Sequence, residues 1–200
     1  MSKTCHCRST VGATCLLLIA VAGLSPFRAV PQESVAPVAA QQQVRFLGLQ
    51  TELPSNWQRV NPSSSMRLVQ FVAPDNDRGQ SAELIFYYFG AGQGGTPEAN
   101  ITRWRSQFHG TNGATATPEV TRFNVSNMPV TRVKLQGSYA RGIGTGPGGA
   151  GKPNQTLLAA LLQTPRGQVT IQLHGDTSLI DSLAPDFDDM LLSIAPVSTR

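Results

Sequence analysis

The chain has no cysteine beyond residue 15, because Cys5, Cys7 and Cys15 are its only three. The remainder cannot be held together by disulfide bonds, which excludes the class of small disulfide-rich exported domains. Cys5-His6-Cys7 begins like a zinc or copper(I) site, but no second Cys/His pair follows at ligand spacing. We therefore expect no metal site and no cofactor.

The chain also begins without an apolar run long enough to cross a bilayer, which takes about 20 residues. The uncharged run Val11–Leu24 is closed by Pro26 and Arg28. One lysine and one arginine precede it, as in the basic and apolar regions of a secretory signal. The pattern predicts a signal peptide at residues 1–24 and export to the periplasm or the extracellular space.

Two cleavage sites fit this leader, one after Ala22 and one after Ala40, since small residues precede both. We favour the first, which leaves residues 25–46 as a disordered linker rich in Pro, Ala and Gln. Cys15 does not follow the apolar run, as a lipid-modified cysteine must. We expect an exported monomer without a stable membrane anchor.

The chain carries little excess charge of either sign. A leader that ends at residue 40 takes three basic residues and one acidic residue with it, which lowers the formal net charge from +4 to +2. A nucleic-acid surface usually needs a clustered basic stripe. We expect no nucleic-acid partner, but an envelope protein or a small ligand. The basic residues closest in sequence should lie on the solvated faces of a helix and two strands; they are Arg103, Arg105, Arg122, Arg132, Lys134 and Arg141.

Residues 47–196 are patterned as a single α+β domain. Segments in which apolar and polar residues alternate predict strands, and turn sequences join them. Two other segments have helical spacing. The order predicts an antiparallel sheet of about six strands flanked by two main helices. The expected strands are residues 66–72, 82–89, 119–125, 130–139, 156–163 and 168–174, and the expected helices begin at Pro97 and cover 179–194.

The first helix has a clear start. Thr96 can cap it, and Pro97 suits its first position. One apolar stripe should pack on the sheet, while Asn100 should face water. The residues of that stripe are Ile101, Trp104 and Phe108.

Several segments of the chain carry a resemblance: Asn56-Trp57, Ser63–Leu68, Ala82–Gly90, Asn100–Trp104 and Asp186–Ile194. They resemble a group of uncharacterised exported bacterial proteins, whose fold is similar to that of PsbP, the extrinsic photosystem II subunit, and of the Ran-binding Mog protein. The resemblance covers about residues 47–195 and implies a PsbP-like α/β/α sandwich. The resemblance assigns no catalytic residue to this chain. It implies a binding or assembly module, because relatives with this architecture act as such modules more often than as enzymes.

A Gly-rich loop, Gly90–Gly95, leads directly into the first helix, whose free N–H groups can hold an anion or a carboxylate. Trp104 is also a natural core residue, with an indole N–H that needs a partner when buried. The candidate binding residues are Gly92, Gly94, Gly95, Thr96, Arg103, Trp104 and His174.

A second Gly-rich run, Gly146–Lys152, has the spacing of a phosphate-binding P-loop. Pro153 stands where the magnesium-binding Ser or Thr is required, so we interpret the run as a flexible excursion between strands.

Four aspartates near the C-terminus could suggest a cation cluster. They lie on the predicted amphipathic helix rather than in a Gly-pivoted loop, and we expect them on its solvated face. They are Asp181, Asp186, Asp188 and Asp189.

These patterns favour an exported non-enzymatic binding or assembly module of unknown ligand. Two alternatives remain open. His174, with Asp176, could act as the base of a small hydrolase or transferase, or the domain could carry an apolar small molecule. An enzyme requires a concave pocket that joins a histidine to a Ser, Thr or carboxylate. A binding module requires a broad exposed apolar or aromatic patch, and a carrier requires an enclosed apolar cavity.

Overall fold

The structure is a computed structural model that describes residues 40–73, 79–110, 114–140 and 151–198. The predicted signal peptide, the cleavage sites and most of the predicted linker lie outside the described residues. So do residues 141–150, which hold most of the second Gly-rich run. The predictions for these segments therefore stay predictions.

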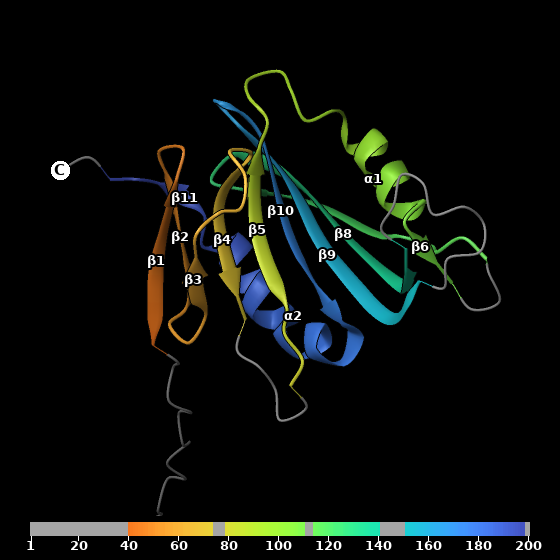
Figure 1. Cartoon of the computed structure of the whole chain (residues 1–200). Coiled ribbons are helices and arrows are strands. Elements are labelled where there is room, and N and C mark those ends of the chain that lie inside the picture. The colour runs from red at the N-terminus through yellow and green to blue at the C-terminus, as the bar shows by residue number, and fades with distance from the viewer. Residues whose placement is uncertain (1–39, 74–78, 111–113, 141–150, 199–200) are drawn as a thin grey trace, which may run out of the picture. The chain divides into compact units, whose positions relative to one another are not determined.

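The main sheet is antiparallel and eight-stranded, in the order β3-β4-β5-β10-β9-β8-β6, with β7 also paired to β8 (Figure 1). Its strands are β3 (Gln58–Val60), β4 (Arg67–Val72), β5 (Glu83–Tyr88), β6 (Phe108–His109), β7 (Glu119–Val125), β8 (Met128–Tyr139), β9 (Lys152–Thr164) and β10 (Gly167–Asp176).

A second, three-stranded sheet has the order β1-β2-β11, and two helices complete the described fold. Their bounds are β1 (Gln41–Phe46), β2 (Leu49–Pro54), β11 (Ala195–Pro196), α1 (Pro97–Arg105) and α2 (Thr177–Leu192). The predicted α+β class with antiparallel sheet and two main helices is confirmed. The strand count exceeds the expected six, because β1 and β2 were not expected and because β3, β6 and β11 have only two or three residues each and leave no periodic signal.

The predicted disordered linker, residues 25–46, extends too far, because its last six residues form strand β1. Gln41–Phe46 pairs in register with Leu49–Pro54, from Gln41 opposite Pro54 to Phe46 opposite Leu49. The segment begins with three glutamines, which are weak strand formers. Pairing with β2 and burial of Val44 and Phe46 in the core outweigh that weak preference.

Three hairpins predicted from the sequence are confirmed. β4 pairs with β5, β7 with β8, and β9 with β10, all antiparallel. Between β7 and β8 the turn consists of Ser126 and Asn127, whose φ angles are 48° and 63°. Two successive residues with positive φ match the twist of the flanking strands, which is why this link can be so short.

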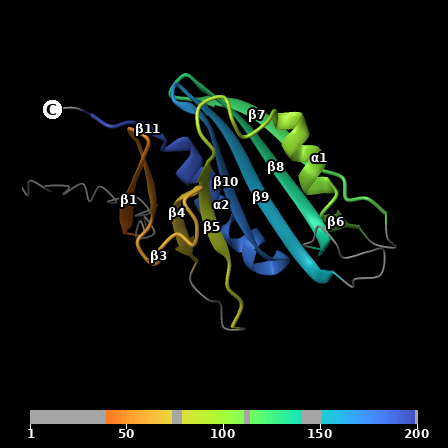
Figure 2. The same cartoon turned by 45° about the horizontal axis from the view of Figure 1, so that its top comes forward.

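The main sheet buries both of its faces, and β9 shows this most clearly. Leu158, Ala160 and Leu162 belong to one core, which also contains the apolar side of α2 and side chains of β1 and β2. The alternate residues Leu157, Ala159 and Leu161 belong to a second core with Trp104 of α1. Since successive strand residues point to opposite faces, α1 and α2 lie on opposite sides of the sheet, as Figures 1 and 2 show.

Helix α2 continues through Pro185. Asp176 caps its N-terminus by accepting a hydrogen bond from the Ser178 backbone N–H at 3.1 Å. Two of its aspartates face β8: Asp188 pairs with Arg132 at 2.6 Å, and Asp181 pairs with Lys134 at 2.9 Å. The predicted solvated acidic face is therefore partly an ion-paired contact with the sheet.

Helix α1 begins as predicted, with Thr96 at the N-cap and Pro97 at the first position. Asn100 does not face water: it is only 2% exposed. Its amide is buried because it donates to the carbonyls of Gly94 at 2.7 Å and Thr96 at 2.9 Å. The helix ends at Arg105, so Phe108 reaches the second core from β6 rather than from the helix.

Candidate functional site

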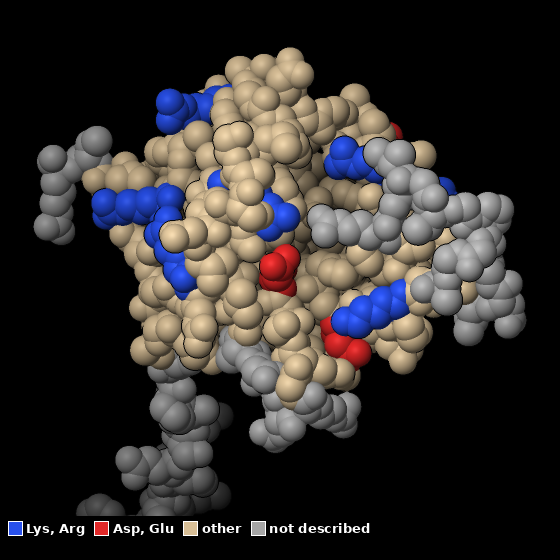
Figure 3. All heavy atoms as spheres, viewed as in Figure 1, with Lys and Arg blue, Asp and Glu red and all other residues tan. Residues whose placement is uncertain are grey.

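Helix α1 covers only part of its side of the main sheet. The second core joins it to β8 and β9, whereas the same face of β5 and β10 carries mostly polar side chains. On β10, Gln168, Thr170, Gln172 and His174 alternate with the core residues Val169, Ile171 and Leu173. This period of two sends the polar set to the α1 side. Figure 3 views the molecule from that side, and shows basic and acidic side chains scattered over it rather than gathered in one block.

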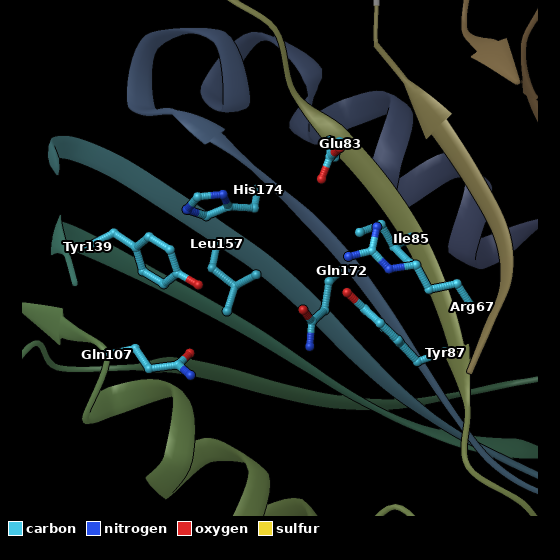
Figure 4. Close-up of a pocket in the computed structure, with 9 residues that line it drawn as sticks. All are labelled: Arg67, Glu83, Ile85, Tyr87, Gln107, Tyr139, Leu157, Gln172 and His174. Carbon is cyan, nitrogen blue, oxygen red and sulfur yellow. The ribbon is translucent and has the colours of Figure 1, made fainter. Parts of the chain in front are cut away.

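A pocket of about 130 Å³ lies on the part of this face that α1 does not cover. Strand register explains which residues meet there: His174 lies opposite Glu83 on one side and opposite Leu157 on the other, and Gln172 lies opposite Ile85. The lining side chains come from five strands, β4, β5, β8, β9 and β10, and from the segment after α1 (Figure 4). The lining residues are Arg67, Glu83, Ile85, Tyr87, Gln107, Tyr139, Leu157, Gln172 and His174. We call this the His174 pocket.

The two charged residues of the His174 pocket are connected through Gln70. Arg67 donates from Nη1 to the Gln70 side-chain oxygen at 3.0 Å, and Gln70 donates from Nε2 to Glu83 at 3.3 Å. Gln70 itself is only 6% exposed. The guanidinium of Arg67 also lies 5.7 Å from the centre of the Tyr87 ring, within reach of a cation–π contact.

Aromatic rings form the other wall. The rings of Tyr139 and His174 are 4.5 Å apart, centre to centre, and Phe108 lies 5.0 Å from Tyr139 and 6.3 Å from His174. Phe108 is fully buried. The buried Phe108 ring therefore packs against both Tyr139 and His174.

Three polar side chains of the pocket are not committed within the described fold. The side-chain amides of Gln107 and Gln172 and the hydroxyl of Tyr139 form no hydrogen bond with any other residue of the described segments. In Figure 4 the hydroxyl of Tyr139 points toward Leu157, and the amide groups of Gln107 and Gln172 lie below Leu157 on either side. They can bond water or a bound molecule.

The Gly-rich loop forms a separate recess, of about 570 Å³, at the start of α1. Gly94, Gly95 and Arg103 line it together with Asn100, and Arg103 donates from Nη2 to the Asn100 side-chain oxygen at 2.7 Å. The carbonyl of Gly94 accepts hydrogen bonds from Asn100 and, at 3.2 Å, from Gln168. These bonds hold the loop against the sheet.

The seven predicted site residues therefore fall into three places. Gly92 and Thr96 line a neighbouring recess of about 350 Å³ that shares Gly95 with the first, so five of the seven gather at the start of α1. Trp104 is 2% exposed and packs in the second core, away from the surface. His174 belongs to the His174 pocket.

Of the residues that line the His174 pocket, only His174 was predicted from the sequence as a site residue. Alternation on β5 was a usable signal, because Glu83, Ile85 and Tyr87 point away from the core residues Leu84 and Phe86. What was lacking was the pairing of β5 with β10, which are distant in sequence. The missed residues are Arg67, Glu83, Tyr87, Gln107, Tyr139 and Gln172.

The chemistry available to an enzyme here is limited. The nine residues that line the His174 pocket include no serine, threonine or cysteine. Asp176, the predicted partner of His174, instead caps α2 through its hydrogen bonds to Ser178. The pocket does join His174 to a carboxylate, that of Glu83, which is one requirement of the hydrolase alternative.

The remaining sequence predictions can also be placed. Lys152 begins strand β9 rather than a helix, so its surroundings are not those of a P-loop lysine. Within the described segments, no three His, Cys, Asp or Glu side chains are grouped so that they could hold a metal ion. Neither described helix is long and apolar enough to cross a membrane.

Comparison with known proteins gives the fold a family likeness. No protein-family model matches the chain, and no curated protein matches it in sequence. The solution structure of cyanobacterial PsbP (CyanoP) from Synechocystis sp. PCC 6803 matches with a TM-score of 0.51 and 15% identity, covering 84% of this chain and 99% of that one. The chain has a PsbP-like fold, as the resemblance in its sequence predicted.

Two further structures are similar at lower scores. One is PA94 of Pseudomonas aeruginosa, a protein of unknown function, with a TM-score of 0.47 and 13% identity over 80% of this chain and 99% of that one. The other is LpqN of Mycobacterium tuberculosis, described as involved in cell envelope biogenesis, with a TM-score of 0.48 and 12% identity over 78% of this chain and 90% of that one. At these identities a likeness bears on the fold alone.

Proposed function

We propose that this PsbP-like chain is an exported, non-enzymatic binding module whose ligand occupies the His174 pocket. The observation that carries the proposal is the convergence of Gln107, Tyr139 and Gln172, three hydrogen-bonding side chains not committed elsewhere in the described fold, on one recess of the uncovered sheet face. Ligand sites are usually clefts in which a few polar groups converge and fix the orientation of the bound molecule.

Binding accounts for the site better than catalysis does. A hydrolytic base must reach a nucleophile or a positioned water, and the lining includes no hydroxyl or thiol nucleophile other than the two tyrosines. Glu83 already accepts a hydrogen bond from Gln70. A hydrolase in which His174 and Glu83 activate water is the second candidate, because the pocket brings these two side chains together.

The carrier alternative is weaker. A carrier of apolar molecules needs an enclosed apolar cavity, whereas most residues around the His174 pocket are polar or charged, with Ile85 and Leu157 the aliphatic exceptions. Export rests on the sequence of the leader, residues 1–24.

The test is capture of ligands from an envelope extract of the producing cell. The bait is the exported protein, compared with Gln172→Glu, which places a carboxylate in the pocket, and with Gln58→Glu, the same change on an exposed residue of β3. We expect one set of compounds or proteins with the parent and with Gln58→Glu, and its loss with Gln172→Glu.

Equal capture by all three proteins would move the binding surface elsewhere. Conversion of a captured compound into a product by the parent, lost in His174→Gln, would replace the binding module by the hydrolase.

A further inference from the structure

We propose that the ligand of the His174 pocket is a compact uncharged molecule with neighbouring hydroxyl groups, such as one sugar ring. This inference rests on the proposed function, since it names the chemistry of the molecule that the pocket binds. It follows from the hydrogen-bonding groups, the charge balance, the ring contacts and the size of the pocket.

The uncommitted groups both donate and accept. Gln107 and Gln172 each present a carbonyl oxygen and an NH₂ group, and Tyr139 presents a phenolic hydroxyl. They come from three different elements: the segment after α1, the middle of β10 and the end of β8. A hydroxyl group also donates and accepts at one atom, so a ring with adjacent hydroxyls can satisfy all three from one position.

The charges in the pocket already compensate each other. Arg67 and Glu83 have opposite formal charges, and Gln70 bonds to both. A ligand with one net charge would lose its hydration beside a site whose own charges sum to zero, which is costly without a partner of opposite sign. An uncharged ligand avoids this cost.

The aromatic rings of the pocket already make contacts with other side chains of the protein. Tyr87 has Arg67 over its ring and stacks on Phe89 at 6.0 Å with 4° between the planes. Tyr139 is tilted against His174 and Phe108. These contacts favour a ligand whose C–H groups rest on the aliphatic side chains of Leu157 and Ile85, rather than a flat aromatic ligand that must stack.

The size of the pocket sets the scale. Its volume of about 130 Å³ is below the roughly 300–1,000 Å³ of sites for drug-sized molecules. One ring is therefore the expected occupant, and a larger molecule would enter with a single unit.

The experiment is an NMR titration of the exported chain with glucose, followed through the side-chain amide signals of Gln107 and Gln172. Glucosamine and glucuronate are matched probes, because they place one positive or one negative charge on the same ring. We expect glucose to shift both amide signals and to bind about fivefold or more tightly than either charged relative.

Two variants localise the effect. Tyr139→Phe removes only the hydroxyl and keeps the ring against His174; we expect glucose to bind about fivefold more weakly. Its control is Tyr88→Phe, which removes a hydroxyl that donates to the Arg166 carbonyl at 2.6 Å and belongs to a residue of the opposite face. That change should leave glucose affinity unaltered.

Tighter binding of a charged sugar, of glycine as a zwitterion, or of acetamide as an amide would overturn the ligand class, and so would unchanged spectra with glucose. If glucose fails while capture from the envelope extract still depends on Gln172, the ligand class is wrong and the binding function stands. If glucose does not bind and capture from the extract does not depend on Gln172, both the ligand class and the proposed function are wrong.

Discussion

The guanidinium of Arg132 on β8 donates two hydrogen bonds to the carboxylate of Asp188 on α2, from Nε at 2.6 Å and from Nη2 at 3.1 Å. The arginine side chain is 18% exposed and the aspartate 43%. Two parallel hydrogen bonds fix the geometry more strongly than a single contact. The pair links α2 to β8.

We expect Asp188→Asn to lower the free energy of unfolding by about 1 kcal/mol, a value discounted for the exposure of the carboxylate. Asp181→Asn is the matched control, because Asp181 receives Lys134 at 2.9 Å in a more exposed pair, and it should cost about 0.5 kcal/mol. Urea denaturation of both variants measures this. Equal losses would show that the bidentate geometry adds nothing.

Stability should depend on pH through Asp186. Burial raises the pKa of this carboxyl above its usual 3.8, the nearby Trp57 indole partly offsets the rise, and Asp189 adds to it. Trp57 is buried, and its indole N–H finds no hydrogen bond of ordinary geometry within the described fold. The folded protein therefore holds the Asp186 proton more tightly than the unfolded chain does.

Ionisation of Asp186 then opposes folding. Its contribution to stability is most favourable below pH 3.8 and is lost as pH rises through the raised pKa of the folded state. We expect Asp186→Asn to gain stability relative to the parent between acidic and neutral pH. Asp189→Asn, on an exposed residue nearby, should gain less, because it removes only the smaller charge effect on Asp186 and leaves the burial of that carboxyl unchanged. Unfolding curves at several pH values decide it, and a parallel pH dependence of the parent and Asp186→Asn would contradict the prediction.

Asn100→Ala should destabilise the Gly-rich loop and α1 together. The substitution removes the donor to the carbonyls of Gly94 and Thr96 and the acceptor of Arg103. The expected loss is about 2 kcal/mol in the free energy of unfolding, because the amide is buried and makes several hydrogen bonds. Asn124→Ala, on an exposed residue of β7, should cost far less. Similar losses at the two sites would show that the loop does not depend on Asn100.

Gly137→Ala should separate β6 from β8. A β carbon at this position would clash with the backbone carbonyl of His109, and the register between β8 and β9 shifts just after it. We expect a loss of about 3 kcal/mol. Gly48→Ala is the control for the backbone cost alone. Gly48 also has a positive φ, 78°, but no atom lies within 4 Å of the added carbon. We expect this substitution to lower the free energy of unfolding by about 1 kcal/mol. Thermal unfolding of both proteins gives the comparison, and equal losses would remove the clash as the cause.

The sequence predicted those parts of the fold that depend on residues close together along the chain. The β7–β8 hairpin has its alternating strands and its Ser126-Asn127 turn within one short stretch. Asn100 was predicted to face water because helical spacing shows only that a residue is polar. It does not show the carbonyls of Gly94 and Thr96, whose hydrogen bonds with Asn100 compensate for its burial. The His174 pocket needed the pairing of β5 with β10, which no local pattern contains.

Strand β9 contributes alternate residues to both cores, with Leu158 on the α2 side and Leu157 on the α1 side. Neither core can open along this strand without exposing the other, so the two should melt as one cooperative unit. Backbone amides of residues 157–162 should then exchange with solvent only through global unfolding. Because Leu157 also lies under the His174 pocket, a ligand there would slow exchange in both halves of the fold, including amides beneath α2 that it never contacts.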